Sequence, residues 1–137
     1  MNRALVTAGG SGIGRAMAQA LHDAGHAIWV TDVDAAALGD CPADWMTTVC
    51  DASNDKQMGK LFNNIKDEWG DLDVLCANAG IAGPTAQIED VALADWQTCV
   101  SVNLEGAFLA TKYATPIMKA KGAGAIIYTS STAGIFG

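Results

Sequence analysis

The stretch that decides the fold is Thr7-Ala8-Gly9-Gly10-Ser11-Gly12-Ile13-Gly14. A short apolar run, residues 3–7, leads into it. Apolar residues spaced three and four apart follow it, from residue 13 to residue 24, where Gly25 supplies a stop. This order predicts a buried strand, a tight turn and a helix.

The same stretch is placed to hold a phosphate. Free backbone N–H groups and the positive end of the helix dipole meet at the start of a helix, and both attract an anion. Gly12 leaves room for a ligand to approach, and Gly14 allows the helix to pack closely on the strand. A flexible turn is the simpler alternative, but a position one strand into a βαβ unit favours a pyrophosphate site. The residues expected to contact it are Gly9, Ser11, Gly12, Ile13 and Gly14.

The rest of the chain repeats the alternation of strand and helix. The other expected strands are residues 27–32, 46–50, 72–77 and 125–129. The expected helices are residues 13–24, 35–38, 54–69 and 93–121, the last with kinks near Gly106 and Pro116. Continuous apolar strands joined by helices require a parallel sheet that is covered on both faces. We therefore predict an α/β fold over residues 1–137, a single doubly wound Rossmann domain that stops after the fifth strand.

Asp32 indicates which dinucleotide this domain would bind. It ends the second predicted strand about 20 residues past the glycine turn, where a carboxylate can accept both hydroxyls of an adenosine ribose. The same charge would repel the 2′-phosphate of NADP, and no basic residue follows in Val33-Asp34-Ala35. Arg15 is the one nearby cation that offers an ion-pair alternative. NAD is therefore the expected cofactor and NADP the less favoured one, with Val33 beside the ribose.

Composition excludes several other classes of protein. The 137 residues carry a net charge of −7, which argues against a nucleic-acid partner. The four cysteines match no zinc spacing, so no metal site is predicted, and they fit a reducing compartment. No targeting segment is visible, and no apolar stretch approaches the roughly 20 residues that cross a bilayer. We expect a cytoplasmic protein without a membrane partner.

Five motifs in order now resemble those of the classical short-chain dehydrogenases/reductases. The glycine turn is similar to the family's Thr-Gly-x-x-x-Gly-x-Gly. Asp51-Ala52 resembles the family's adenine contact, Asn78-Ala79-Gly80 its turn after the fourth strand, and Asn103-Leu104-Glu105-Gly106 its Asn-x-x-Gly segment. Residues 126–134 resemble the strand that carries the catalytic serine, which aligns with Ser131, with Ser130 the second choice. Singly, each has a plain structural explanation, such as a turn cap for Asp51.

The resemblance implies a mechanism. Hydride would pass between the nicotinamide and a small-molecule alcohol or carbonyl, a secondary alcohol or ketone. Ser131 would hydrogen-bond the substrate oxygen, and Asn103 would hold a water that relays a proton. A tyrosine, its pKa lowered by a lysine four residues later, would act as general acid and base. The resemblance also implies a homo-oligomer for the complete enzyme.

The sequence departs from the family pattern in three ways. Ala8 replaces the first loop glycine, and we expect a negative φ there with a small local effect. Ala77 replaces the first asparagine of the turn. The Tyr-x-x-x-Lys pair is absent, since Ile117 and not lysine follows Tyr113 at that spacing, and Thr132 follows Tyr128.

The missing pair predicts that residues 1–137 alone have no dehydrogenase activity, and we favour an incomplete sequence or fragment. Two alternatives remain open. One is a non-catalytic dinucleotide-binding module, and the other is a methyltransferase that uses S-adenosylmethionine, which also has a glycine loop and an acidic residue after its second strand.

Overall fold

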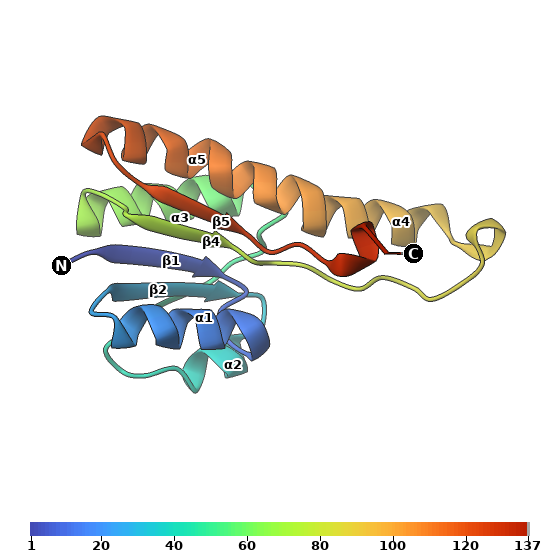
Figure 1. The fold of residues 1–137 in the computed structure, drawn as a ribbon, viewed down its shortest axis with the longest axis horizontal. Helices are drawn as coiled ribbons and strands as arrows, with labels where there is room; N and C mark the ends of the chain where they lie inside the picture. The colour runs from blue at the N-terminus through green and yellow to red at the C-terminus, as the bar shows by residue number, and fades with distance from the viewer. Residues whose placement is uncertain (137) are drawn as a thin grey trace.

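The strands form one parallel sheet in the order β3-β2-β1-β4-β5 (Figure 1). This computed structural model describes residues 1–136. The strands are β1 (Arg3–Thr7), β2 (Ala27–Asp32), β3 (Met46–Val49), β4 (Val74–Ala77) and β5 (Ala125–Tyr128). Because β1 pairs in parallel with both β2 and β4, the chain reverses its winding direction beside β1. The predicted doubly wound fold is confirmed.

Helices cover both faces of the sheet. They are α1 (Gly12–Asp23), α2 (Ala35–Gly39), α3 (Asp55–Trp69), α4 (Leu93–Val100) and α5 (Gly106–Lys121), with short 3₁₀ turns η1 (Ile88–Asp90) and η3 (Thr132–Gly134). On β1, Ala4 and Val6 pack in the core cluster with α1 and α2, while Leu5 packs with α3 and α5. The central strands β1, β2 and β4 are apolar on both faces for this reason, whereas the edge strands β3 and β5 keep exposed residues.

Helix ends follow the signals in the sequence. The side chain of Asn54 accepts a hydrogen bond from the N–H of Gln57 and caps α3, and Gly70 ends α3 in the left-handed conformation. The long helical tract differs in detail from the prediction. Its irregularity is a π-helical turn, η2 (Ser101–Glu105), placed just before Gly106, and α5 continues through Pro116.

The carboxyl ends of the strands meet at one edge of the sheet, and an arm extends from that edge (Figure 1). The arm contains α4, η3 and the loop after β4, and α4 has no buried residue. At the opposite edge, Asp73, which precedes β4, links β1 and α5: it accepts hydrogen bonds from the N–H of Arg3 and from Lys121 at the end of α5. Within residues 1–136, no helix has the length and apolar character needed to cross a membrane.

At Ala8 the backbone contradicts our expectation. Its φ is +51°, in the left-handed region, where we expected a negative value. The Ala8 carbonyl lies against α1, and the next N–H, of Gly9, donates to the carbonyl of Thr31 at 2.8 Å. These two constraints fix the peptide and force the angle. A side chain in this region costs about 1–2 kcal/mol, so the methyl group has more than a small local effect.

Ala8→Gly should therefore raise the free energy of unfolding by about 0.5–1 kcal/mol, because glycine adopts a positive φ without that cost but loses some chain entropy. Urea denaturation measures the change. The control is Ala20→Gly on the exposed face of α1, which should lower the stability by about 1 kcal/mol. A loss of stability in Ala8→Gly would contradict the strain that we assign to this residue.

Candidate active site

The turn between β1 and α1 presents the open backbone predicted for a phosphate site. A Cβ added to Gly14 would overlap with the Ala8 carbonyl oxygen and come within 2.7 Å of Asn78 Nδ2, so only glycine fits there. Gly12 has φ +54° and open space around it, so its conformation rather than its neighbours requires glycine. The first N–H groups of α1 have no partner within the helix, as at any helix start. The larger of two neighbouring pockets adjoins this helix start and is lined there by Ser11, Ile13 and Gly14.

Asp32 lies directly against this turn. One carboxylate oxygen, Oδ2, accepts a hydrogen bond from the N–H of Gly10 at 3.0 Å, and the other, Oδ1, accepts one from the N–H of Asp34 at 3.1 Å. A carboxylate oxygen accepts more than one hydrogen bond, so both oxygens retain capacity for ribose hydroxyls. Val33 follows with an exposed side chain.

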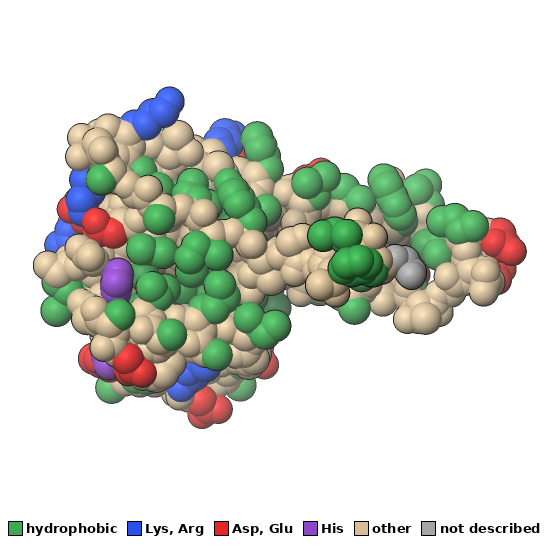
Figure 2. Space-filling model, in the orientation of Figure 1, with side chains coloured by type: hydrophobic (Ala, Val, Ile, Leu, Met, Phe, Trp, Pro, Cys, Tyr) green, Lys and Arg blue, Asp and Glu red, His purple; other side chains and the backbone are tan. Residues whose placement is uncertain are grey.

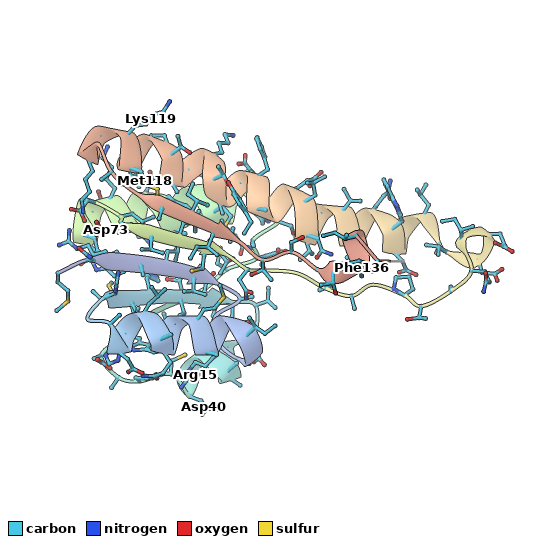
Figure 3. The ribbon with its side chains drawn as sticks, in the orientation of Figure 1. Arg15, Asp40, Asp73, Met118, Lys119 and Phe136 are labelled. Carbon is cyan, nitrogen blue, oxygen red and sulfur yellow. The ribbon has the colours of Figure 1, made fainter. Side chains whose placement is uncertain are left out.

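The guanidinium of Arg15 is already engaged, mainly by residues at the end of α2. Its guanidinium donates to the carbonyl of Asp40 at 2.9 Å and to the Cys41 sulfur at 3.3 Å, and lies 5.2 Å from the centre of the Trp45 ring. Figure 3 labels Arg15 and Asp40 at this end of α2. These contacts hold the cation beside α2, and a longer one, 3.5 Å from Nη1 to the carbonyl oxygen of Gly10, also links it to the glycine turn.

A smaller pocket of about 320 Å³ adjoins Asp32 and includes Asp51 and Ala52. Asp51 Oδ1 accepts from both the N–H and the hydroxyl of Ser53, so this carboxylate caps a turn through one oxygen. Cys50 lies at the same pocket, where burial, with a smaller effect of the Asp51 charge, raises the pKa of its thiol to about 11.

Asn78 and Ala79 connect the end of β4 to the end of β1. Thr7 Oγ1 accepts hydrogen bonds from the backbone N–H groups of Asn78, at 3.0 Å, and Ala79, at 3.1 Å. The side chain of Asn78 donates back to the carbonyls of Thr7 and Ala8. The turn after β4 is therefore fixed against the glycine turn.

Asn103 lies in the π-helical turn η2, and both ends of its side chain are occupied. Its Oδ1 accepts from the N–H of Ile81 at 2.7 Å, and its Nδ2 donates to the carbonyl of Ile81 at 2.8 Å. This pair of bonds holds the loop after Gly80. Any water that Asn103 binds would have to use its main chain or share these atoms.

Ser131 stands at the start of η3. Its Oγ accepts a hydrogen bond from the N–H of Ala133 at 3.2 Å, which leaves the hydroxyl hydrogen free to donate to another molecule. Ser130 and Ser131 line the same pocket, so the geometry does not decide which of them is the catalytic serine.

The structure brings these residues together in one cleft. The larger pocket, of about 700 Å³, shares with the smaller one the residues Ala8, Ser11, Ala79, Gly80 and Ile81. The larger pocket also contains Ile13, Gly14, Asn78, Asn103 and Ser131. Two predicted contacts line neither pocket: Gly12, and Gly9, which packs behind the turn against Val30.

Several residues of the cleft were not among the predicted site residues. They are Ala8, Ile81, Leu104, Thr129 and Gly134 in the larger pocket, and Cys50 and Val102 in the smaller one. Thr129 gave a usable signal, a polar residue two positions before the predicted serine. Ile81 gave none, because it takes part through its backbone.

Neither tyrosine of the chain reaches the cleft. The hydroxyl of Tyr113 donates to Asp55 at 2.6 Å, and this bond raises the pKa of Tyr113 above its usual value, the opposite of what a catalytic base needs. The Tyr128 hydroxyl pairs with Thr111 at 2.7 Å. Among the cleft-lining residues of the described chain, none is a tyrosine or a lysine.

Comparison with known proteins agrees with the fold. The family model for short chain dehydrogenases matches residues 2–137. Similar curated relatives include cis-4-hydroxycyclohexanecarboxylate dehydrogenase of Sinomonas cyclohexanicum, 38% identical, with 98% of this chain and 56% of the relative aligned. Levodione reductase of Leifsonia aquatica is 35% identical, with 97% and 53% aligned. The chain thus spans about half the length of the curated relatives it matches.

Solved structures give the same result. A crystal structure of levodione reductase superposes with a TM-score of 0.93 at 32% identity, over 99% of this chain and 56% of that one. A crystal structure of NAD⁺-bound xylitol dehydrogenase superposes with a TM-score of 0.94 at 29% identity, over 99% and 55%.

Gly14→Ala tests the close approach at the glycine turn. The added methyl group should lower the free energy of unfolding by about 2–3 kcal/mol, since the Ala8 carbonyl cannot move away without breaking its contacts. Thermal denaturation followed by circular dichroism measures this. In the matched control, Gly39→Ala at the end of α2, the methyl group meets no atom within 4 Å and should leave stability unchanged or raised. Equal effects of the two substitutions would contradict the packing role of Gly14.

Proposed function

The chain belongs to the short-chain dehydrogenase family, and on that premise we propose that its protein transfers a hydride between NAD(H) and a secondary alcohol or ketone. The observation that carries the proposal is the Asp32 carboxylate, bonded to the N–H of Gly10 at the mouth of a glycine turn. Cyclic alcohols and ketones are suitable first substrates, because two relatives are named for cis-4-hydroxycyclohexanecarboxylate and levodione.

The residues of the cleft fit a dinucleotide. The glycine turn leaves open backbone for the pyrophosphate, and the smaller pocket offers Asp32, Val33, Asp51 and Ala52 to the adenosine. The larger pocket offers room for the nicotinamide half beside Ser131. The NAD⁺-bound xylitol dehydrogenase, which has the same fold, supports this assignment.

NAD is preferred over NADP on electrostatic grounds. A 2′-phosphate would lie close to the negative charge of Asp32, which is held at the turn by its two N–H donors. The cation that could offset the repulsion, Arg15, is engaged by Asp40, Cys41 and Trp45 beside α2. Recruiting it would break those contacts.

The proposed mechanism assigns distinct tasks to two residues. A nicotinamide held in the larger pocket would supply or accept the hydride. The Ser131 hydroxyl donates a hydrogen bond to the substrate oxygen, and that donation is available because Ala133 occupies only an acceptor site of Oγ. Asn103 holds the loop at Ile81 and keeps the π-helical turn beside the cleft, where a relay water would bind.

For the whole protein, we propose a homo-oligomer in the cytoplasm. Leu93, Trp96, Leu104 and Phe108 are exposed along α4, η2 and α5, and Figure 2 shows hydrophobic side chains along the arm. Surfaces of this kind support association. The four cysteines are free thiols, which supports a reducing compartment.

Asp32→Asn tests the cofactor. In the natural full-length protein, the affinity for NADH should fall by roughly tenfold, because a charged acceptor of the ribose hydroxyls is lost, while the affinity for NADPH rises. Fluorescence titration with both nucleotides measures the two dissociation constants. Asp34→Asn is the control: it removes the same charge two residues away and keeps a side chain able to cap α2. NADPH binding as tight as NADH binding in the wild type would refute the preference.

A second experiment separates binding from turnover. Residues 1–137, produced alone and free of host enzymes, should bind NADH but turn over no alcohol, since the cleft residues described here supply no phenol and lysine. The natural full-length protein should oxidise or reduce a cyclic substrate. If the full-length protein binds NADH and shows no turnover with any alcohol or ketone, the non-catalytic dinucleotide-binding module is the correct interpretation. Turnover by residues 1–137 alone would contradict the proposal that catalysis needs a tyrosine and a lysine that this cleft does not contain.

A further inference from the structure

Both ends of the Asn78 side chain form hydrogen bonds. The amide nitrogen bonds to the glycine turn, and the amide oxygen bonds to the segment that leads from β5 to Ser131. Its Nδ2 donates to the carbonyls of Thr7, at 3.2 Å, and Ala8, at 3.4 Å. Its Oδ1 accepts from Thr129 Oγ1 at 2.8 Å. Because backbone carbonyls only accept, the NH₂ group must face the turn, and the hydroxyl of Thr129 must then be the donor.

The peptide between Ala8 and Gly9 depends on this arrangement. Its N–H, from Gly9, donates to Thr31, and its carbonyl, from Ala8, receives the Asn78 amide. This orientation of the peptide requires a φ of +51° at Ala8, which is unfavourable for an alanine. The hydrogen bonds from the two neighbouring strands therefore oppose the strain of the alanine.

Thr129 couples the two halves of the cleft. It follows β5 directly, its N–H donates to the carbonyl of Ala77 at 3.2 Å, and it lines the larger pocket two residues before Ser131. A change at Thr129 thus reaches the glycine turn through Asn78 and the serine through the backbone.

We propose that Thr129 is a positioning residue: its hydroxyl orients the Asn78 carboxamide, and Asn78 holds the Ala8–Gly9 peptide in the conformation that accepts a dinucleotide. Thr129 acts on the nucleotide through this chain of hydrogen bonds. The inference rests on the proposed dinucleotide function, and it adds a residue that couples the nucleotide-binding turn to the strand of Ser131.

The test is Thr129→Val in the natural full-length protein, which removes the hydroxyl and keeps the shape. The dissociation constant for NADH should rise roughly five- to tenfold, the effect of losing one hydrogen bond. Thr129→Ser keeps the donor and should restore binding to within about twofold of the wild type, since one methyl group contributes little to the hydrogen bond. The control is Thr115→Val in α5, where the lost hydroxyl donates to Thr111 away from the cleft and NADH binding should not change.

A second background separates positioning from simple packing. In Ala8→Gly the peptide conformation needs less support, so Thr129→Val should weaken NADH binding less than about twofold there. Unchanged binding in Thr129→Val, failure of Thr129→Ser to restore it, or the same loss in both backgrounds would overturn the inference. A wild-type protein that binds neither NADH nor NADPH would instead overturn the proposed function, and this inference with it.

Discussion

The carbonyl oxygen of Ala8 is the atom on which the arrangement of the cleft depends. It lies so close to the start of α1 that residue 14 must be glycine, and it accepts the amide of Asn78 from the end of β4. Parallel strands bring their carboxyl ends to one edge of the sheet, but they do not fix the distance between the loops that follow. Here that distance is fixed by hydrogen bonds among Thr7, Ala8 and Asn78, and β5 joins the same set through Thr129.

The division of the cleft follows from the order of the strands. β2 and β3, on one side of β1, bring carboxylates, and the smaller pocket carries both Asp32 and Asp51. β4 and β5, on the other side, bring amides and hydroxyls, and the larger pocket carries Asn78, Thr129 and Ser131. A ligand that spans both pockets would meet a site for sugar hydroxyls at one end and uncharged hydrogen-bonding groups at the other. The glycine turn lies between them.

Most of the fold could be predicted because it depends on local patterns. Apolar runs bounded by glycine or aspartate marked all five strands, and Asn54 and Gly70 marked the ends of α3. Asp32 could be placed for the same reason, since the end of a strand beside the reversal point has a fixed position in this topology. The sequence-based assignments of strands and helices therefore needed only small changes in their bounds.

The details that escaped prediction depend on contacts between distant segments. The φ of Ala8 is set by Thr31 and Asn78, which are far from it in the chain. The side chain of Asn103 is engaged by the backbone of Ile81, which carries no side-chain signal. Arg15 was the cation expected to offer an ion pair beside Asp32, yet its guanidinium is held mainly at the end of α2. In each case a partner distant in the sequence selects a conformation that the local sequence does not predict.

The π-helical turn at residues 101–105 has a consequence for how the protein tolerates changes in length. Such a turn is equivalent to one extra residue inserted into an α-helix, so α4 and α5 are out of phase along a continuous tract. Deleting a single residue there would restore regular α-helical hydrogen bonding and make the helix itself more favourable. It would also rotate α4 by about 100° relative to α5 and turn the position of Asn103 away from Ile81. The irregular turn thus keeps a locally less stable helix in the register that the loop beside the cleft requires.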